Sequence, residues 1–453
     1  MKAVLLIDFG STYTKVTAVD LDAPQLLGTA QSYTTVEEDV SIGLEKALAQ
    51  LTRQTGPLNF QERYACSSAA GGLRMIASGL VPSLTAEAAK RAALGAGAKV
   101  VKTYAYELTE EDLEEIQALK PDIFLLCGGT DGGNQDCVIH NARMLAGMAP
   151  CFPIVLAGNR AASRACEQTL AQGGHEVIPC QNVMPTFNQL NIEPCQKVIR
   201  EVFLRRIVAA KGLTKASRLI SGILMPTPAA VLAALTLLSQ SLGELMAVDL
   251  GGATTDVYSI TAGLPTRGGT VLRGLPEPYA KRTVEGDIGM RYSAQGVVEA
   301  VGLDRVVQAS GQTEEAVLDW IARIRRKPGI LAQSQAEAQM DFALASLAIE
   351  VGLARHAGTI EQVFTPMGVA YQQTGKDLTR VSRLVLTGGA LIHTGQAEAI
   401  ALQAMATQQY PNSLMPRSAG VLVDKRYILS AMGLLSQNHE ALAKDLMIKE
   451  FSA

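Results

Sequence analysis

The 453-residue sequence predicts an α/β protein with two related lobes and a further α/β subdomain inserted into the first lobe. Three observations carry this prediction. One ten-residue strand–turn–strand pattern near the N-terminus recurs in the second half of the chain. Strands alternate with helices between residues 97 and 212. Hydrophobic residues make up 48% and charged residues 18%, which is typical of a globular chain with a large core.

The first lobe is predicted to open with three hairpin-connected strands. Continuous apolar runs and β-rich stretches place them at residues 3–8, 14–19 and 25–35. The stretch 36–53 then carries apolar side chains at helical spacing, which predicts an amphipathic helix.

The middle of the chain has the rhythm of a parallel α/β unit. A helix should begin after Thr109, because Asp112 three residues later completes a capping-box pattern. The predicted strands are 99–104, 122–127, 153–157 and 176–179, and a closing helix covers 195–210.

From residue 245 the opening pattern returns. A strand runs into Asp-Leu-Gly-Gly, helices are expected to dominate from 285 to 370, and a strand at 383–386 runs into two glycines. The predicted domains are therefore 1–96 (first part of the N-terminal lobe), 97–212 (inserted subdomain), 213–244 (return of the N-terminal lobe and a connecting helix) and 245–453 (C-terminal lobe).

The recurring pattern is the strongest signal for function. Residues 7–16 (IDFGSTYTKV) align without gaps on 248–257 (VDLGGATTDV), with four of ten positions identical. A tight turn with glycine and hydroxyl residues presents backbone N–H groups to an anion. The aspartate at the end of each first strand can hold a hydrated Mg²⁺ that bridges phosphates. Two such loops predict a clamp for a polyphosphate–metal complex.

Several function classes are excluded. The net charge of −3 lacks the basic excess of a general nucleic-acid coat. The N-terminal apolar run breaks at Asp8, and no apolar stretch approaches the ~18 residues that span a bilayer, so we expect no membrane segment and a cytoplasmic protein. The seven cysteines have no C-x-x-C spacing, which predicts reduced, mostly buried thiols rather than a zinc site or a disulfide framework.

At this point the chain resembles the actin-like ATPase superfamily, which includes actin, DnaK-type chaperones and sugar kinases. The two loops are similar to its phosphate-1 and phosphate-2 motifs, and residues 384–391 (LVLTGGAL) to its adenosine motif. Residues 225–230 (MPTPAA) resemble the start of its first connecting helix, and residues 426–436 resemble its last crossing helix. The implied fold is two duplicated ribonuclease H-like lobes, and the implied cofactors are ATP and Mg²⁺.

Over its whole length the chain also resembles the glutamate mutase MutL (GlmL) family, accessory proteins of adenosylcobalamin-dependent mutases that are unrelated to the mismatch-repair proteins of the same name. The segments that carry this likeness are 8–12 (DFGST), 127–134 (CGGTDGGN), 283–291 (TVEGDIGMR) and 424–427 (DKRY). The resemblance implies a reactivating chaperone or assembly factor whose partners are mutase subunits; the oligomeric state is left open.

The superfamily resemblance implies a role for each matching residue. Asp8 and Asp249 would hold Mg²⁺ through water, and Asp256 would assist in the same shell. These three aspartates are the expected catalytic residues. The residues that would contact phosphates or adenosine are Gly10, Ser11, Thr12, Lys15, Gly251, Gly252, Thr254, Gly388, Gly389 and Ala390. Asp287 and Arg291 fall near the position of a helix that lines the base pocket.

Met225 departs from the superfamily pattern. DnaK-type chaperones have a glutamate there and actin a glutamine, near the attacking water, and a thioether can neither orient water nor accept its proton. We therefore expect ATP binding with at most weak hydrolysis. Two other functions stay open: a small-molecule kinase that uses Asp131 as its base, and a nucleotide-binding scaffold without turnover.

Overall fold

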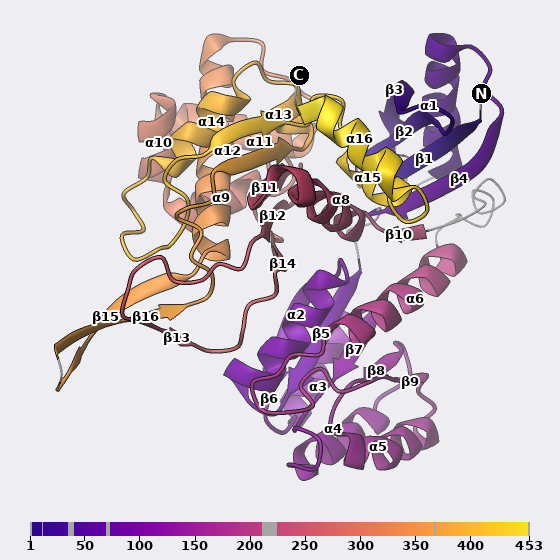
Figure 1. Cartoon of the computed structure of the whole chain (residues 1–453), viewed down its shortest axis with the longest axis vertical. Helices are drawn as coiled ribbons and strands as arrows, with labels where there is room; N and C mark the ends of the chain where they lie inside the picture. Colours follow the sequence, from indigo (N-terminus) through magenta and orange to yellow (C-terminus); the bar gives the residue numbers. More distant parts are fainter. Residues whose placement is uncertain are drawn as a thin grey trace. The chain divides into compact units, whose positions relative to one another are not determined.

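The protein divides into two compact units. The computed structural model describes residues 2–10, 12–34, 40–68, 73–210, 224–366 and 368–451 (Figure 1). The first unit contains residues 1–230 together with 274–276, and the second contains 231–273 together with 277–453. Among the described residues, no helix is both long and apolar enough to cross a membrane.

The first unit opens with a five-stranded sheet in the order β10-β4-β1-β2-β3. Its strands are β1 (Ala3–Phe9), β2 (Tyr13–Asp20), β3 (Gln25–Tyr33), β4 (Phe60–Ser67) and β10 (Leu224–Pro226). The first three pair antiparallel, and β4 and β10 add parallel to β1. Helix α1 (Val40–Thr55) packs on this sheet and ends two residues beyond the predicted range of 36–53. Residues 36–39 of that prediction lie outside the described residues.

The second unit repeats this topology. Its five-stranded sheet has the order β14-β12-β11-β17-β18. The strands are β11 (Leu245–Leu250), β12 (Thr255–Ile260), β14 (Ala280–Glu285), β17 (Arg383–Thr387) and β18 (Gly420–Val423). Three antiparallel strands are again followed by two that run parallel to the first. The duplicated ribonuclease H-like fold class is confirmed.

A second sheet of the first unit is the inserted α/β subdomain, with parallel strands in the order β6-β5-β7-β8-β9. The strands are β5 (Arg74–Gly79), β6 (Lys99–Ala105), β7 (Ile123–Leu126), β8 (Ile154–Leu156) and β9 (Val177–Pro179). This is a doubly wound order whose switch point lies between β5 and β7. Because β5 pairs with both β6 and β7, the predicted insert boundary at residue 97 falls within a segment that builds one sheet.

Helices cover both faces of this sheet. Helices α2 and α6 pack with β5, β7 and β8 into a buried cluster that also holds the apolar face of β1, while α3, α4 and α5 bury the opposite face. The helices are α2 (Glu87–Gly95), α3 (Glu110–Leu119), α4 (Asp136–Ala146), α5 (Arg160–Gln172) and α6 (Glu193–Ala210), with a π-helical turn η2 (Pro82–Ala86) before α2. The predicted capping box of α3 is present, with Thr109 and Asp112 each bonding the other's backbone.

The second unit is completed by further helices, most of which line a core that contains Trp320. They are α9 (Ala294–Val301), α10 (Leu303–Ser310), α11 (Glu314–Arg326), α12 (Gln335–His356), α13 (Gly389–Ile392), α14 (Ala397–Met405), α15 (Leu429–Leu435) and α16 (Glu440–Phe451). Helix α8 (Thr227–Leu242) begins in the first unit and continues in the second.

A small three-stranded sheet extends from the second unit, in the order β13-β16-β15 (Figure 1). Its strands are β13 (Thr270–Arg273), β15 (Thr359–Thr365) and β16 (Gly368–Thr374). The expectation that helices continue to residue 370 is wrong here. The side chain of Phe364 near its tip is 83% exposed.

Candidate functional site

The two repeated turns are closed by the same backbone hydrogen bond. The amide of Gly10 donates to the carbonyl of Tyr13 at 3.1 Å, and the amide of Gly251 donates to the carbonyl of Thr254 at 2.9 Å. A Cβ at Gly10 would lie 2.6 Å from that carbonyl oxygen, so the turn requires glycine there. The strand registers also match, because Asp8 pairs with Lys15 and Asp249 pairs with Asp256. The internal repeat of the sequence is therefore a repeat of backbone geometry.

In the first unit a row of side chains crosses the sheet at Asp8. Asp8 pairs with Lys15 on β2 and with Cys66 on β4, and Cys66 pairs in turn with Met225 on β10. Asp8 is 4% exposed. Its Oδ1 accepts a hydrogen bond from the Thr227 hydroxyl at 2.7 Å, and its Oδ2 lies 3.4 Å from Lys15 Nζ. Lys15 thus lies against the carboxylate rather than in solvent.

Two neighbours of Asp8 were not among the site residues predicted from the sequence. Thr227 is the first residue of α8 and closes over Asp8. Cys66 pairs with Asp8 across the sheet, and burial together with the Asp8 carboxylate raises the pKa of its thiol well above the usual value. The threonine that follows Met225 and Pro226 was the only sequence signal for this contact.

In the second unit the two aspartates differ in their surroundings. Asp249 is half-buried at the end of β11. Asp256 is buried, and its Oδ1 accepts from Arg282 Nε at 2.7 Å, while its Oδ2 accepts from the Thr254 hydroxyl at 3.3 Å. Asp256 therefore has a buried cation as its partner.

The glycine pair after β17 is fitted to the phosphate-2 strand. Gly388 has φ +100°, and a Cβ there would lie 2.4 Å from the Leu250 carbonyl oxygen and 2.8 Å from Asp249 Oδ1. Gly389 and Ala390 begin α13, and both are more exposed than Gly388. The preceding Thr387 pairs with Asp249 across the sheet and donates its hydroxyl to Asp424 Oδ2 at 3.0 Å. The predicted adenosine segment thus meets the phosphate-2 strand directly.

The segment 283–291 braces the second turn. The amides of Met290 and Arg291 donate to the carbonyls of Gly251 and Gly252, each at 2.9 Å. A Cβ at Gly289 would lie 2.6 Å from the carbonyl carbon of Ala253. The Arg291 guanidinium pairs with Asp341 at 3.3 Å, whereas Asp287 is exposed. This packing explains in physical terms why glycine stands at 289.

The other predicted residues fall into three groups. Ser11 lies outside the described residues. Thr12 and Gly252 lie half-exposed in the turns beside Gly10 and Gly251. Asp131 lies in the inserted subdomain, where its Oδ1 accepts from the Arg160 amide and from Asn182 Nδ2, each at 2.9 Å. Asp131 therefore ties together three loops of the subdomain.

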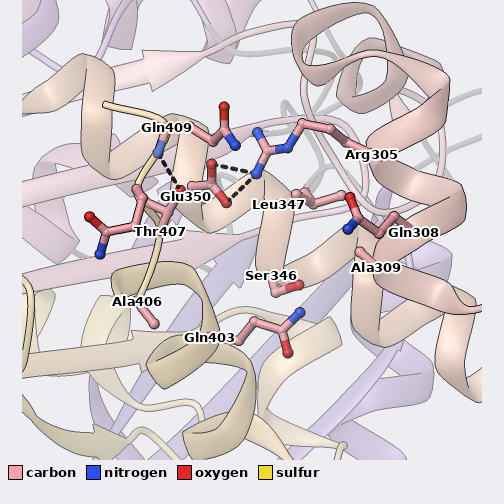
Figure 2. Close-up of a pocket in the computed structure, with 11 residues that line it drawn as sticks. Arg305, Gln308, Ala309, Ser346, Leu347, Glu350, Gln403, Ala406, Thr407 and Gln409 are labelled. Atoms are coloured by element: carbon pink, nitrogen blue, oxygen red, sulfur yellow. Dashed lines mark hydrogen bonds and ion pairs between the residues drawn. The ribbon is translucent and has the colours of Figure 1, made fainter. Parts of the chain in front are cut away.

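The structure also holds a polar hollow that the sequence did not predict. It has a volume of about 340 Å³ and is formed by α10, α12, α14 and the residues after α14 (Figure 2). Arg305 donates to both oxygens of buried Glu350 at 2.9 and 3.0 Å, and glutamines surround the pair. Within the described residues, no cluster of three or more His, Cys, Asp or Glu side chains suits a metal ion.

The comparisons with known proteins address the family. The family model described as "MutL protein" matches residues 4–451. The chain belongs to the MutL protein family. It is 47% identical over 461 residues to "Protein MutL" of Clostridium tetanomorphum, covering 99% of both chains. The family resemblance drawn from the sequence is confirmed.

Solved structures show more distant likenesses. Component A of the (R)-2-hydroxyglutaryl-CoA dehydratase of Acidaminococcus fermentans has 10% identity and a TM-score of 0.33, covering 98% of this chain and 100% of that one. Gluconate kinase of Lactobacillus acidophilus has 10% identity and a TM-score of 0.37, covering 98% and 92%. Likenesses this weak carry no argument about what this chain binds.

A pair of glycine substitutions tests the contact between the adenosine segment and β11. We expect Gly388→Ala to lower the free energy of unfolding by about 2 kcal/mol or more, because the new Cβ meets backbone and the φ is left-handed. Gly389→Ala is the matched control, since nothing lies within 4 Å of its Cβ and it begins a helix. Denaturant unfolding measures both; equal stability of the two variants would contradict the contact.

Asp424 gives a prediction about pH. Burial, opposed by hydrogen bonds from the amides of Ile428 and Leu429 and from Thr387, raises its pKa to about 6. The folded protein therefore holds this proton more tightly than the unfolded chain does. The resulting stabilisation is complete below about pH 4 and is lost as the pH rises through about 6.

The measurement compares wild type with Asp424→Asn, which cannot titrate. Lowering the pH from about 7 to about 4 should stabilise wild type relative to Asp424→Asn by on the order of 2 kcal/mol in the free energy of unfolding. A difference that does not change with pH would mean that Asp424 ionises normally in the fold.

Proposed function

We propose that the chain binds Mg²⁺-ATP through its two repeated turns and acts as an ATP-dependent accessory protein of an adenosylcobalamin-dependent mutase such as glutamate mutase. The observation that carries the nucleotide part is the duplicated turn. Each copy combines a glycine-closed backbone with an aspartate in the same strand register. Such turns offer backbone N–H groups to phosphate oxygens.

The residues present suit a hydrated Mg²⁺. Gly388 keeps the space beside Asp249 Oδ1 clear of side-chain atoms, and Asp249 is half-buried rather than enclosed. Asp8 and Asp249 would hold the ion through water, and Ser11, Thr12 and Thr254 would donate to phosphate oxygens. Bound Mg²⁺ would supply charge neutralisation at the phosphates.

Turnover is proposed to be slow. Met225 is buried and lies in the row of Asp8, one strand beyond Cys66. The Met225 side chain has no oxygen or nitrogen atom that could orient a water molecule for in-line attack. A slow ATPase fits a switch whose state persists as long as the γ-phosphate is present.

The mutase partner is proposed from the family, and the inserted subdomain is the proposed contact. Its loops at the C-terminal edge of the strands are tightly braced, with Asn182 Nδ2 donating to the Gly129 carbonyl at 3.1 Å. In the same loop region Phe187 is 71% exposed. An exposed aromatic side chain on a rigid loop is typical of a protein contact.

The kinase alternative has less support. A general base must be within reach of an acceptor hydroxyl, whereas Asp131 Oδ1 is held by two hydrogen-bond donors of its own subdomain. A scaffold without turnover differs from the proposal only in the rate of hydrolysis.

Neutral substitutions test the two aspartates. Asp8→Asn and Asp249→Asn should each weaken Mg²⁺-ATP binding on the order of a hundredfold, because each removes an acceptor for metal-bound water. Asp304→Asn, on the exposed side of α10, should bind like wild type. If calorimetry gives the wild-type affinity for either Asp8→Asn or Asp249→Asn, the proposal that both repeated turns bind Mg²⁺-ATP is wrong.

Met225→Gln tests the rate of hydrolysis. A side-chain amide near the attacking water should raise basal ATP hydrolysis roughly tenfold or more. Met225→Leu is the control, since it keeps an apolar side chain of similar size. Phosphate release that is equal in both variants would place the water-orienting group elsewhere.

Partner capture tests the inserted subdomain. Cutting out residues 97–212 would remove β6, β7, β8 and β9 and leave β5 without its partner strands, so a surface substitution is the cleaner experiment. Phe187→Ala should weaken capture of purified mutase subunits about tenfold while leaving ATP binding intact. Phe364→Ala, which removes another largely exposed aromatic side chain in the second unit, is the control. Loss of capture in the control alone would move the contact to the three-stranded sheet.

A further inference from the structure

The second repeated turn has two peptide groups whose carbonyls are held from the same side. The amide of Met290 donates to the Gly251 carbonyl and the amide of Arg291 donates to the Gly252 carbonyl, each at 2.9 Å. Both peptide bonds are trans. In a trans peptide unit the carbonyl and the following N–H point in opposite directions. The amides of Gly252 and Ala253 are therefore aimed away from these two donors.

The two amides form one face of the turn. Neither donates a hydrogen bond to another group among the described residues, and both residues are half-exposed. Successive backbone N–H groups that point the same way make a concave site for an anion. The position of the segment that holds the two carbonyls therefore decides how well this turn can hold a phosphate group.

A carboxylate on α12 fixes that segment. Arg291 Nη2 donates to Asp341 Oδ2 at 3.3 Å and Nη1 to Oδ1 at 3.5 Å, and Nη1 also donates to the Met290 carbonyl at 2.6 Å. Both side chains of the ion pair are mostly buried. The Thr255 hydroxyl adds a further hold by donating to the Ile288 carbonyl at 3.0 Å. The guanidinium thus ties the backbone behind the turn to α12.

The same carboxylate binds the single tryptophan of the chain. Trp320 on α11 is 1% exposed, and its Nε1 donates to Asp341 Oδ1 at 3.0 Å. Burial raises the pKa of Asp341, and the contacts with Arg291 and Trp320 oppose that rise. One carboxylate therefore joins the segment behind the turn, helix α12 and an indole in the core of the second unit.

We propose that Asp341 is a positioning residue for the second repeated turn and links a nucleotide bound there to α11 and α12 through Arg291 and Trp320. The inference rests on the proposed function, in which this turn binds Mg²⁺-ATP, and adds a route by which the occupancy of the turn acts on the helices. A phosphate bound by the Gly252 and Ala253 amides pulls on their peptide planes, and hence on the two carbonyls and the guanidinium behind them. The position of the carboxylate against the indole then depends on whether the turn is occupied.

The first experiment uses the full-length wild-type protein. Because the chain has one tryptophan, emission excited selectively from tryptophan reports Trp320 alone. Titration with Mg²⁺-ATP should change this emission saturably, with a midpoint equal to the dissociation constant from calorimetry. Binding in calorimetry without any change in emission would overturn the link to α11. Absence of binding in calorimetry would refute the proposed function, and this inference with it.

Asp341→Asn tests the positioning role. The carboxamide can still accept from Trp320 but has no charge to hold Arg291, so we expect Mg²⁺-ATP to bind about tenfold more weakly and the emission change to shrink. Asp319→Asn is the matched control on α11, since its side chain is 65% exposed, and it should behave like wild type. Wild-type affinity together with a wild-type emission change in Asp341→Asn would overturn the proposal and leave the nucleotide site standing.

A double-mutant cycle separates positioning from a general loss of stability. Arg291→Met should weaken binding as much as Asp341→Asn, and the variant with both changes should bind no more weakly than either alone, because the two side chains act through one link. Arg291→Lys keeps the charge and should retain more affinity than Arg291→Met. Thermal melting without nucleotide checks that each variant is folded, and the wild-type emission test decides the link where one is not. Additive losses in the double variant would contradict the proposal.

Discussion

One backbone hydrogen bond fixes the candidate site in each unit. A glycine amide donates to the carbonyl three residues later, and this turn joins the first strand to the second. Because the turn has the same length in both copies, the aspartate one residue before the end of the first strand always faces the same position of the second strand. The polar chemistry of each unit is built around this aspartate, and the rest of each sheet supplies its neighbours.

The two copies satisfy the charge of that aspartate differently. In the first unit the residue opposite Asp8 is Lys15, so the cross-strand pair is neutral. In the second unit Asp256 stands opposite Asp249, and like charges in that position repel. Arg282 from the third strand removes the conflict by binding Asp256 at 2.6 Å. Asp249 thus keeps a half-exposed carboxylate while its neighbour is neutralised. The alignment of the two motifs shows Lys15 in the place of Asp256, whereas Arg282 lies outside both motifs and only the fold brings it to Asp256.

The sequence predicted those parts of the fold whose signals are local. The duplicated turn, the capping box of α3 and the alternating strands and helices of the inserted subdomain depend on residues close together in the chain. Strand β4 was not predicted, because Gln61, Glu62 and Arg63 interrupt its apolar pattern. The extended sheet of β13, β15 and β16 has mostly exposed side chains and hence no burial pattern to detect. The Thr227–Asp8 contact joins distant segments, and only the fold brings these together.

The equivalent rows of the two sheets also differ in polarity, and this bears on which unit could direct water. In the second unit the row continues from Asp249 to Thr387, whose hydroxyl is bound by Asp424. In the first unit the same positions hold Cys66 and Met225. The first unit therefore has sulfur where the second has oxygen, and Asp8 depends on Thr227 and Lys15 for its strong hydrogen-bond donors. A sheet edge arranged in this way favours holding a charged ligand in place over activating water, and this is the physical basis for proposing a switch rather than a fast hydrolase.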